Sequence, residues 1–120
     1  MSDRRLSGTR LTFYVPESRR LHGVLAYEWL LERALKLGLH GGSAFRATAG
    51  FGRRHHLHEA SFFELAGDLP MAVTFVVDAE EEARLWAMLQ HERVSLFYTR
   101  EPVEYGVLNG DGDFASGPRP

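Results

Sequence analysis

The chain has 120 residues, with 14 lysines and arginines, 16 aspartates and glutamates, and no cysteine. This length is typical of one domain whose core is too small to enclose a large pocket, so we expect any sizeable ligand to bind between chains. The lack of cysteine excludes disulfides, thiolate metal sites and a cysteine nucleophile. The net charge of −2 indicates no nucleic-acid partner. Because no membrane-length apolar segment or signal peptide is present, we expect a cytoplasmic protein without membrane insertion.

The first half of the chain predicts a strand, a helix and a weaker strand. Apolar residues alternate over residues 10–15, as in a half-buried strand, and recur with a helical period over residues 22–37. Ser18 is a candidate N-cap for this helix, and Gly38 is expected to adopt the left-handed conformation that ends it. A second strand is predicted over residues 43–49.

The second half predicts the clearest strand, over residues 69–77, then a helix over residues 79–91 and a strand over residues 94–99. Asp78 and Glu81 have the spacing of a capping box, so we interpret the acidic residues 80–82 as helix capping without a catalytic role. Residues 1–9 are expected to be flexible, residues 10–105 to form the domain, and the Gly/Pro-rich residues 106–120 to form a disordered tail.

The order β-α-β-β-α-β predicts the α+β class and a ferredoxin-like fold, with an antiparallel sheet and two helices on one face. The other face of the sheet is expected to carry Thr12, Tyr14, Ala72, Thr74 and Val76, or else the alternate residues of the same strands. A face this apolar favours burial against another subunit.

Short motifs across residues 10–105 resemble the DUF190 family (domain of unknown function 190). They are Leu11-Thr12-Phe13-Tyr14-Val15, Glu17-Ser18, His22-Gly23, Tyr27-Glu28, Gly38-Leu39-His40-Gly41-Gly42-Ser43, Gly50-Phe51-Gly52, Leu57-His58, Asp68-Leu69-Pro70, Val77-Asp78 and Glu101-Pro102-Val103-Glu104. This family is similar to the PII signal-transduction proteins. The resemblance implies a regulatory homotrimer of ferredoxin-like subunits that binds an adenine nucleotide in clefts between neighbours. It also implies a mobile loop, from about Gly52 to Phe63, that acts on a partner. A membrane transporter or channel is the implied partner, because family members are often encoded beside a small fluoride channel.

Two glycine-rich segments are candidates for binding the phosphates of a nucleotide or another small anion. Backbone N–H groups at strand ends can surround a phosphate, and nearby arginines can neutralise its charge. The candidate residues are Gly41, Gly42, Ser43, Arg46, Gly50, Gly52, Arg53 and His58. The alternative interpretation is that the glycines only provide the positive φ angles of turns.

Two other functions compete with nucleotide sensing. The cluster His55, His56, His58 and Glu59 contains the ligand types of a zinc, copper or nickel site. A ligand-free interaction module is the third hypothesis, because residues 91–95 lack the glycine-rich, lysine-containing phosphate segment that PII proteins carry after their second helix. No nucleophile elbow or His-Glu-x-x-His motif is present, so we expect no enzymatic activity.

Overall fold

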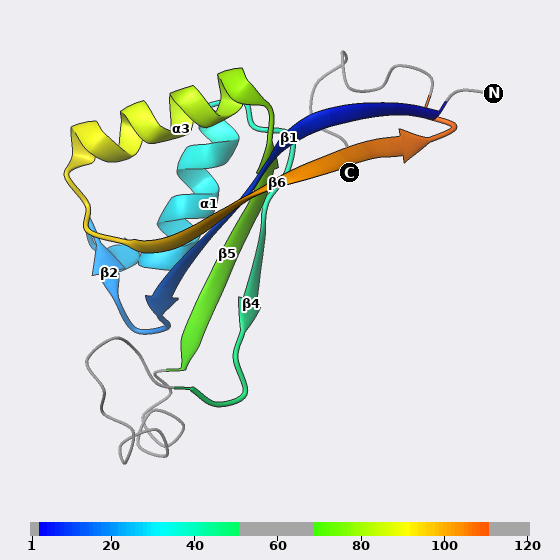
Figure 1. The fold of residues 1–120 in the computed structure, drawn as a ribbon. Coiled ribbons are helices and arrows are strands. Elements are labelled where there is room, and N and C mark those ends of the chain that lie inside the picture. The colour runs from blue at the N-terminus through cyan, green and yellow to red at the C-terminus, as the bar shows by residue number, and fades with distance from the viewer. Residues whose placement is uncertain (1–2, 51–68, 111–120) are drawn as a thin grey trace.

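The structure is a computed structural model that describes residues 3–50 and 69–110. Within these residues four strands form one antiparallel sheet in the order β4-β5-β1-β6, and two helices cover the same face of it (Figure 1). The strands are β1 (Asp3–Pro16), β4 (Ser43–Arg46), β5 (Pro70–Val77) and β6 (Phe97–Leu108), and the helices are α1 (Ala26–Lys36) and α3 (Ala79–Glu92). This arrangement confirms the predicted α+β, ferredoxin-like fold.

The core lies between the helices and the sheet, because alternate residues of β1 and β5 point toward the helices. Leu11, Phe13 and Phe75 are fully buried there, and the rings of Phe13 and Phe75 meet edge to face. Trp29 of α1 is also buried, whereas Trp86 of α3 is only partly buried against the core.

The start of α1 differs from the prediction. Residues 20–25 form a small hairpin, β2 (Arg20–Leu21) and β3 (Val24–Leu25), so the helix begins at Ala26 rather than at residue 22. The hairpin turns at His22 and Gly23, which both have positive φ angles. The N-cap position is occupied by Leu25 without a side-chain hydrogen bond, so Ser18 does not cap the helix.

Two predicted helix-end motifs are present in the structure, one after the last residue of α1 and one at the start of α3. Gly38 has a φ of 87°, the left-handed conformation expected after α1. At the start of α3, the backbone N–H of Glu81 donates to Asp78 Oδ1 at 2.8 Å, and the backbone N–H of Asp78 donates to Glu81 Oε1 at 2.9 Å. The capping box is therefore confirmed.

The strands β1 and β6 are much longer than predicted. β1 begins at Asp3, so residues 3–9 are strand rather than a flexible terminus. β6 begins at Phe97 and continues to Leu108, so residues 94–96 are not strand and residues 106–108 belong to the sheet rather than to the tail. Residues 3–8 pair only with residues 103–108, and this two-stranded segment, called the arm below, projects beyond the end of β5 (Figure 1). β4 is shorter than predicted and ends at Arg46.

Candidate functional site

The face of the sheet opposite the helices is an open groove with a volume of about 780 Å³. Its strand register aligns side chains in rows that cross all four strands. The first row is aromatic and apolar, with Phe45 61% exposed, Tyr14 40% exposed and Phe97 45% exposed. The five residues predicted for this face, Thr12, Tyr14, Ala72, Thr74 and Val76, all line the groove.

The second row consists of four hydroxyl side chains, one from each strand. The residues are Ser43, Thr74, Thr12 and Thr99 in spatial order. The hydroxyl oxygens of Thr12 and Thr74 lie 3.1 Å apart and form a hydrogen bond. The groove therefore offers an apolar row suited to packing beside a polar row suited to hydrogen bonding, and a flat partner surface can use both.

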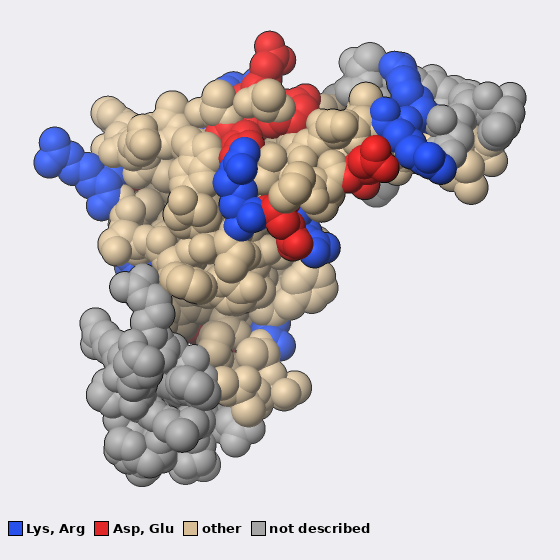
Figure 2. All heavy atoms as spheres, viewed as in Figure 1, with Lys and Arg blue, Asp and Glu red and all other residues tan. Residues whose placement is uncertain are grey.

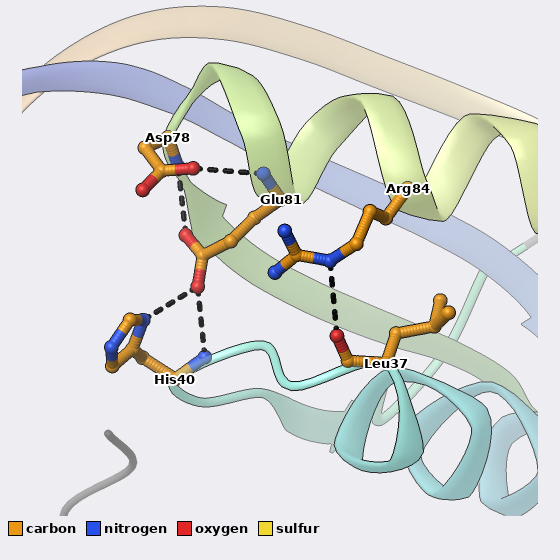
Figure 3. A network of polar contacts seen from close by, with 5 residues as sticks. All are labelled: Leu37, His40, Asp78, Glu81 and Arg84. Atoms are coloured by element: carbon orange, nitrogen blue, oxygen red, sulfur yellow. Dashed lines mark hydrogen bonds and ion pairs between the residues drawn. The ribbon is translucent and has the colours of Figure 1, made fainter. Parts of the chain in front are cut away.

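The segment that enters the groove before β4 is held in place by Glu81 (Figure 3). The Oε2 atom of Glu81 accepts hydrogen bonds from the backbone N–H of His40 at 3.1 Å and from its Nδ1 at 2.5 Å. Since a carboxylate only accepts, the Nδ1 atom carries the hydrogen. On the other side of this segment, Arg84 Nε donates to the carbonyl oxygen of Leu37 at 3.0 Å. Helix α3 thus fixes the backbone from Leu37 to His40, directly before the candidate residues Gly41–Ser43.

Gly41, Gly42 and Ser43 lie together in the groove, as three neighbouring candidates for binding an anion. The alternative that these glycines provide positive φ angles is wrong for Gly41 and Gly42, because neither has a positive φ. A β-carbon at Gly42 would lie 2.5 Å from the ring of Phe75, so this glycine is required by close packing. A β-carbon at Gly41 would meet nothing within 4 Å, which leaves its backbone open to an approaching ligand.

The structure does not bring Arg46 into the groove with these residues. Alternation along β4 directs Ser43 and Phe45 into the groove and Arg46 to the opposite side. The Nη2 atom of Arg46 lies 2.5 Å from Oε2 of Glu17, with which it forms an ion pair. The only arginine among the described lining residues is Arg10, which pairs with Glu101 at 2.6 Å.

The remaining candidate residues are placed only in part. Gly50 lies after β4, where its β-carbon position is 3.3 Å from Cγ of Pro70. Gly52, Arg53 and His58 lie outside the described residues, as does the alternative metal set His55, His56, His58 and Glu59. Within residues 3–50 and 69–110, no group of three or more histidine, aspartate or glutamate side chains is arranged to hold a metal ion.

Glu82 has partners that the capping interpretation did not foresee. Its carboxylate accepts two hydrogen bonds from Arg100 of β6, at 2.5 Å and 3.0 Å, and one from Nε1 of Trp86 at 2.9 Å. The hydrogen bond from Arg100 lowers the pKa of Glu82, although burial acts in the opposite direction. This contact joins α3 to β6. No local sequence pattern indicates it, because Glu82 and Arg100 belong to different elements.

Tyr105 lines the groove where the arm leaves the sheet. Burial raises the pKa of the Tyr105 phenol, and the carboxylates of Asp78 and Glu81 raise it further. Sequence reasoning missed Tyr105 because residues 100–105 were expected to follow the last strand. Among the described residues, no helix has both the length and the apolar character needed to cross a membrane.

Comparisons with known proteins agree on a family and a fold. The model of the DUF190 family, described as an uncharacterized ACR, matches residues 8–105. The UPF0166 protein of Aquifex aeolicus (strain VF5) is 35% identical over 74 residues, which is 62% of this chain and 70% of the relative.

Solved structures of PII-like proteins are similar to this chain. CPII from Thiomonas intermedia K12, bound to ADP and bicarbonate, has a TM-score of 0.54 and 17% identity, with 87% of this chain and 93% of CPII covered. A protein described as PII-like and signalling, from Thermus thermophilus, has a TM-score of 0.56 and 16% identity, with 89% of this chain and 95% of that protein covered. At these identities the likeness shows a shared fold.

Proposed function

Because this chain belongs to the DUF190 family and has the fold of the PII-like proteins, we propose that it is a regulatory protein that binds an adenine nucleotide between the subunits of a homotrimer. The observation that carries the proposal is the open face of the sheet, on which aromatic side chains of β4, β1 and β6 are exposed beside the groove. A single chain leaves this face in water, and a face of this kind is typical of subunit contacts. We also propose that the protein acts in the cytoplasm and that it has no enzymatic activity.

The nucleotide is proposed to bind with its phosphates near Gly41–Ser43. The open space beside Gly41 supports this placement, because a backbone N–H can approach a phosphate there without steric hindrance. The Ser43 hydroxyl adds a donor, and Arg53 is the arginine proposed to neutralise the charge, since Arg46 lies on the other side of the sheet. An adenine nucleotide is the preferred ligand because CPII, which shares this fold, has been solved with ADP.

Regulation is proposed to act through the segment from about Gly52 to Phe63. A nucleotide bound beside β4, the strand that leads toward this glycine-flanked segment, would favour one arrangement of the segment and so change its fit to a partner. The proposed partner is a membrane transporter or channel.

Isothermal titration with ADP, AMP and ATP tests the ligand, and light scattering tests the assembly. We expect one adenine nucleotide to bind each subunit and the mass in solution to be three times the chain mass of 13.6 kDa. Arg53→Ala should weaken ADP binding about tenfold, the effect of one charge-assisted contact. Lys36→Ala, which removes an exposed cation from α1, is the matched control and should leave the affinity unchanged.

The same titrations distinguish the competing functions. If no adenine nucleotide binds at millimolar concentration, nucleotide sensing is wrong. Binding of zinc, copper or nickel alone would then favour the histidine cluster, and no binding at all would favour the ligand-free interaction module. A monomeric mass would remove the proposed cleft between subunits.

A further inference from the structure

The arm is too small to be stable in water by itself. It consists of residues 3–8 of β1 paired with residues 103–108 of β6, six residue pairs that no third strand within residues 3–50 and 69–110 supports. Strands of this length span about 20 Å, and an isolated two-stranded ribbon in water is marginally stable at best. The arm projects away from the helices and from β5, so both of its faces are open to a partner surface within the described part of the chain (Figure 1).

The two faces of the arm differ in character. One face continues the open face of the sheet and is apolar except for Arg4; its residues are Arg4, Leu6, Gly8, Val103, Tyr105 and Val107. The opposite face carries Arg5, Ser7 and Glu104, with Leu108 at the end of the strand. Val107 is 41% exposed although it lies on the apolar face. This difference identifies the face that a partner should cover.

The direction of the arm is set by close packing where it leaves the sheet. A β-carbon at Gly8 would lie 2.7 Å from Cε1 of Tyr105 and closer still to the carbonyl oxygen of Val77. The Tyr105 ring therefore occupies the space that a side chain at position 8 would need. This contact keeps the apolar face of the arm continuous with the groove, whose lining includes Leu6 and Tyr105.

The groove has the shape and charge to receive the arm of a second copy. Its aromatic row and flat four-strand surface suit the packing of one β-structure against another. Among the described residues that line it, the charged ones are Asp78, Glu81, Glu101 and Arg10. Arg10 pairs with Glu101 and Glu81 is buried, so the groove has a net negative charge in which Asp78 is the carboxylate nearest to being available. The one charged residue on the apolar face of the arm is the cation Arg4, and Figure 2 shows basic side chains on the projecting arm.

We propose that the apolar face of the arm of one copy packs into the groove of the next copy, with Arg4 near the acidic side chains of that groove. The distal residues of the arm, Arg4 and Val107, do not line the groove, so a contact between them and the groove of the next copy is heterologous and closes when it is repeated around a ring. The inference rests on the proposed homotrimer and adds to it the surfaces that hold the ring together.

Thiol accessibility tests this contact, since the chain has no cysteine of its own. Val107→Cys places a thiol on the apolar face of the arm, and Ser7→Cys places the matched control on the opposite, exposed face. The rate of reaction with a thiol reagent is measured for both variants in the full chain, with the mass followed by light scattering. We expect Val107→Cys to react at least tenfold more slowly than Ser7→Cys in the assembled protein. On dilution to monomers, the two rates should become similar.

The outcomes separate this inference from the proposed function. Equal rates for the two thiols in a protein of trimeric mass would overturn the arm contact and leave the trimer intact. A monomeric mass for the unsubstituted chain would overturn the trimer itself. As a second measurement, Val107→Asp should shift the mass toward the monomer while Ser7→Asp should not, and an unchanged mass for both contradicts the proposal. Circular dichroism of each variant confirms that its fold is retained.

Discussion

Replacing Glu81 by glutamine should destabilise the protein by about 2 kcal/mol, although the two side chains have the same shape. Residue Glu81 is only 4% exposed, and both oxygens of its carboxylate accept hydrogen bonds. Oε1 accepts one from the backbone N–H of Asp78, and Oε2 accepts two from His40. Glutamine has one carbonyl oxygen, so its NH₂ group must face one of these donors.

The expected magnitude follows from the groups left without an acceptor. A buried N–H without a partner costs about 1–3 kcal/mol, and hydrogen bonds to a charged acceptor contribute about 1.5–3 kcal/mol each. The His40 side chain is about one-third exposed, so its ring N–H can form a hydrogen bond with water when the carboxylate is lost. The expected loss of stability therefore lies near the middle of this range. Since Gly41–Ser43 directly follow His40, the substitution should also weaken any ligand bound by these residues.

Urea unfolding at one fixed chain concentration measures the effect, because the stability of an oligomer depends on concentration. Glu80→Gln is the matched control: it removes the same charge from the same turn of α3, but Glu80 is exposed. We expect this control to change the free energy of unfolding by about 0.5 kcal/mol or less. If Glu81→Gln and Glu80→Gln have equal effects, the network around Glu81 does not stabilise the fold and the reasoning is wrong.

Two further changes test packing and charge. Gly42→Ala should destabilise by about 1–3 kcal/mol in urea unfolding, because the new methyl group would lie 2.5 Å from a core aromatic ring; Gly41→Ala, with open space around it, should have little effect, and equal losses would contradict the packing argument. Arg100→Met should destabilise the protein at neutral pH, since it removes two hydrogen bonds to the Glu82 carboxylate. Because the pKa of Glu82 is lowered in the folded protein, its ionised carboxylate stabilises the fold at pH values above the ordinary glutamate pKa. This stabilisation is lost as the pH falls through the pKa that Glu82 has in the folded protein. The difference between Arg100→Met and the unsubstituted protein should therefore shrink at acid pH, and a constant difference would refute the assignment.

Part of the candidate site was predictable because its signals are local. Gly41–Ser43 could be placed at the start of a strand from the glycines and the alternation that follows. The position of these residues beside the hydroxyl row could not be predicted, because it depends on the register between β4 and β5. Arg46 was placed with them by nearness in sequence, whereas alternation along β4 turns it to the other side of the sheet.

The sequence by itself determined the order of the four sheet strands and two helices, the fold class and the two helix signals at Gly38 and Asp78. Each of these depends on residues within about one turn of helix or one strand, where local backbone preferences act. The length of β1 and β6 was decided only by tertiary structure. Gly8 and Gly106 argue against a strand locally, and the pairing of residues 3–8 with residues 103–108 overrides that preference. The arm exists because two segments far apart in the sequence, residues 3–8 and 103–108, pair with each other, and no window of sequence contains both.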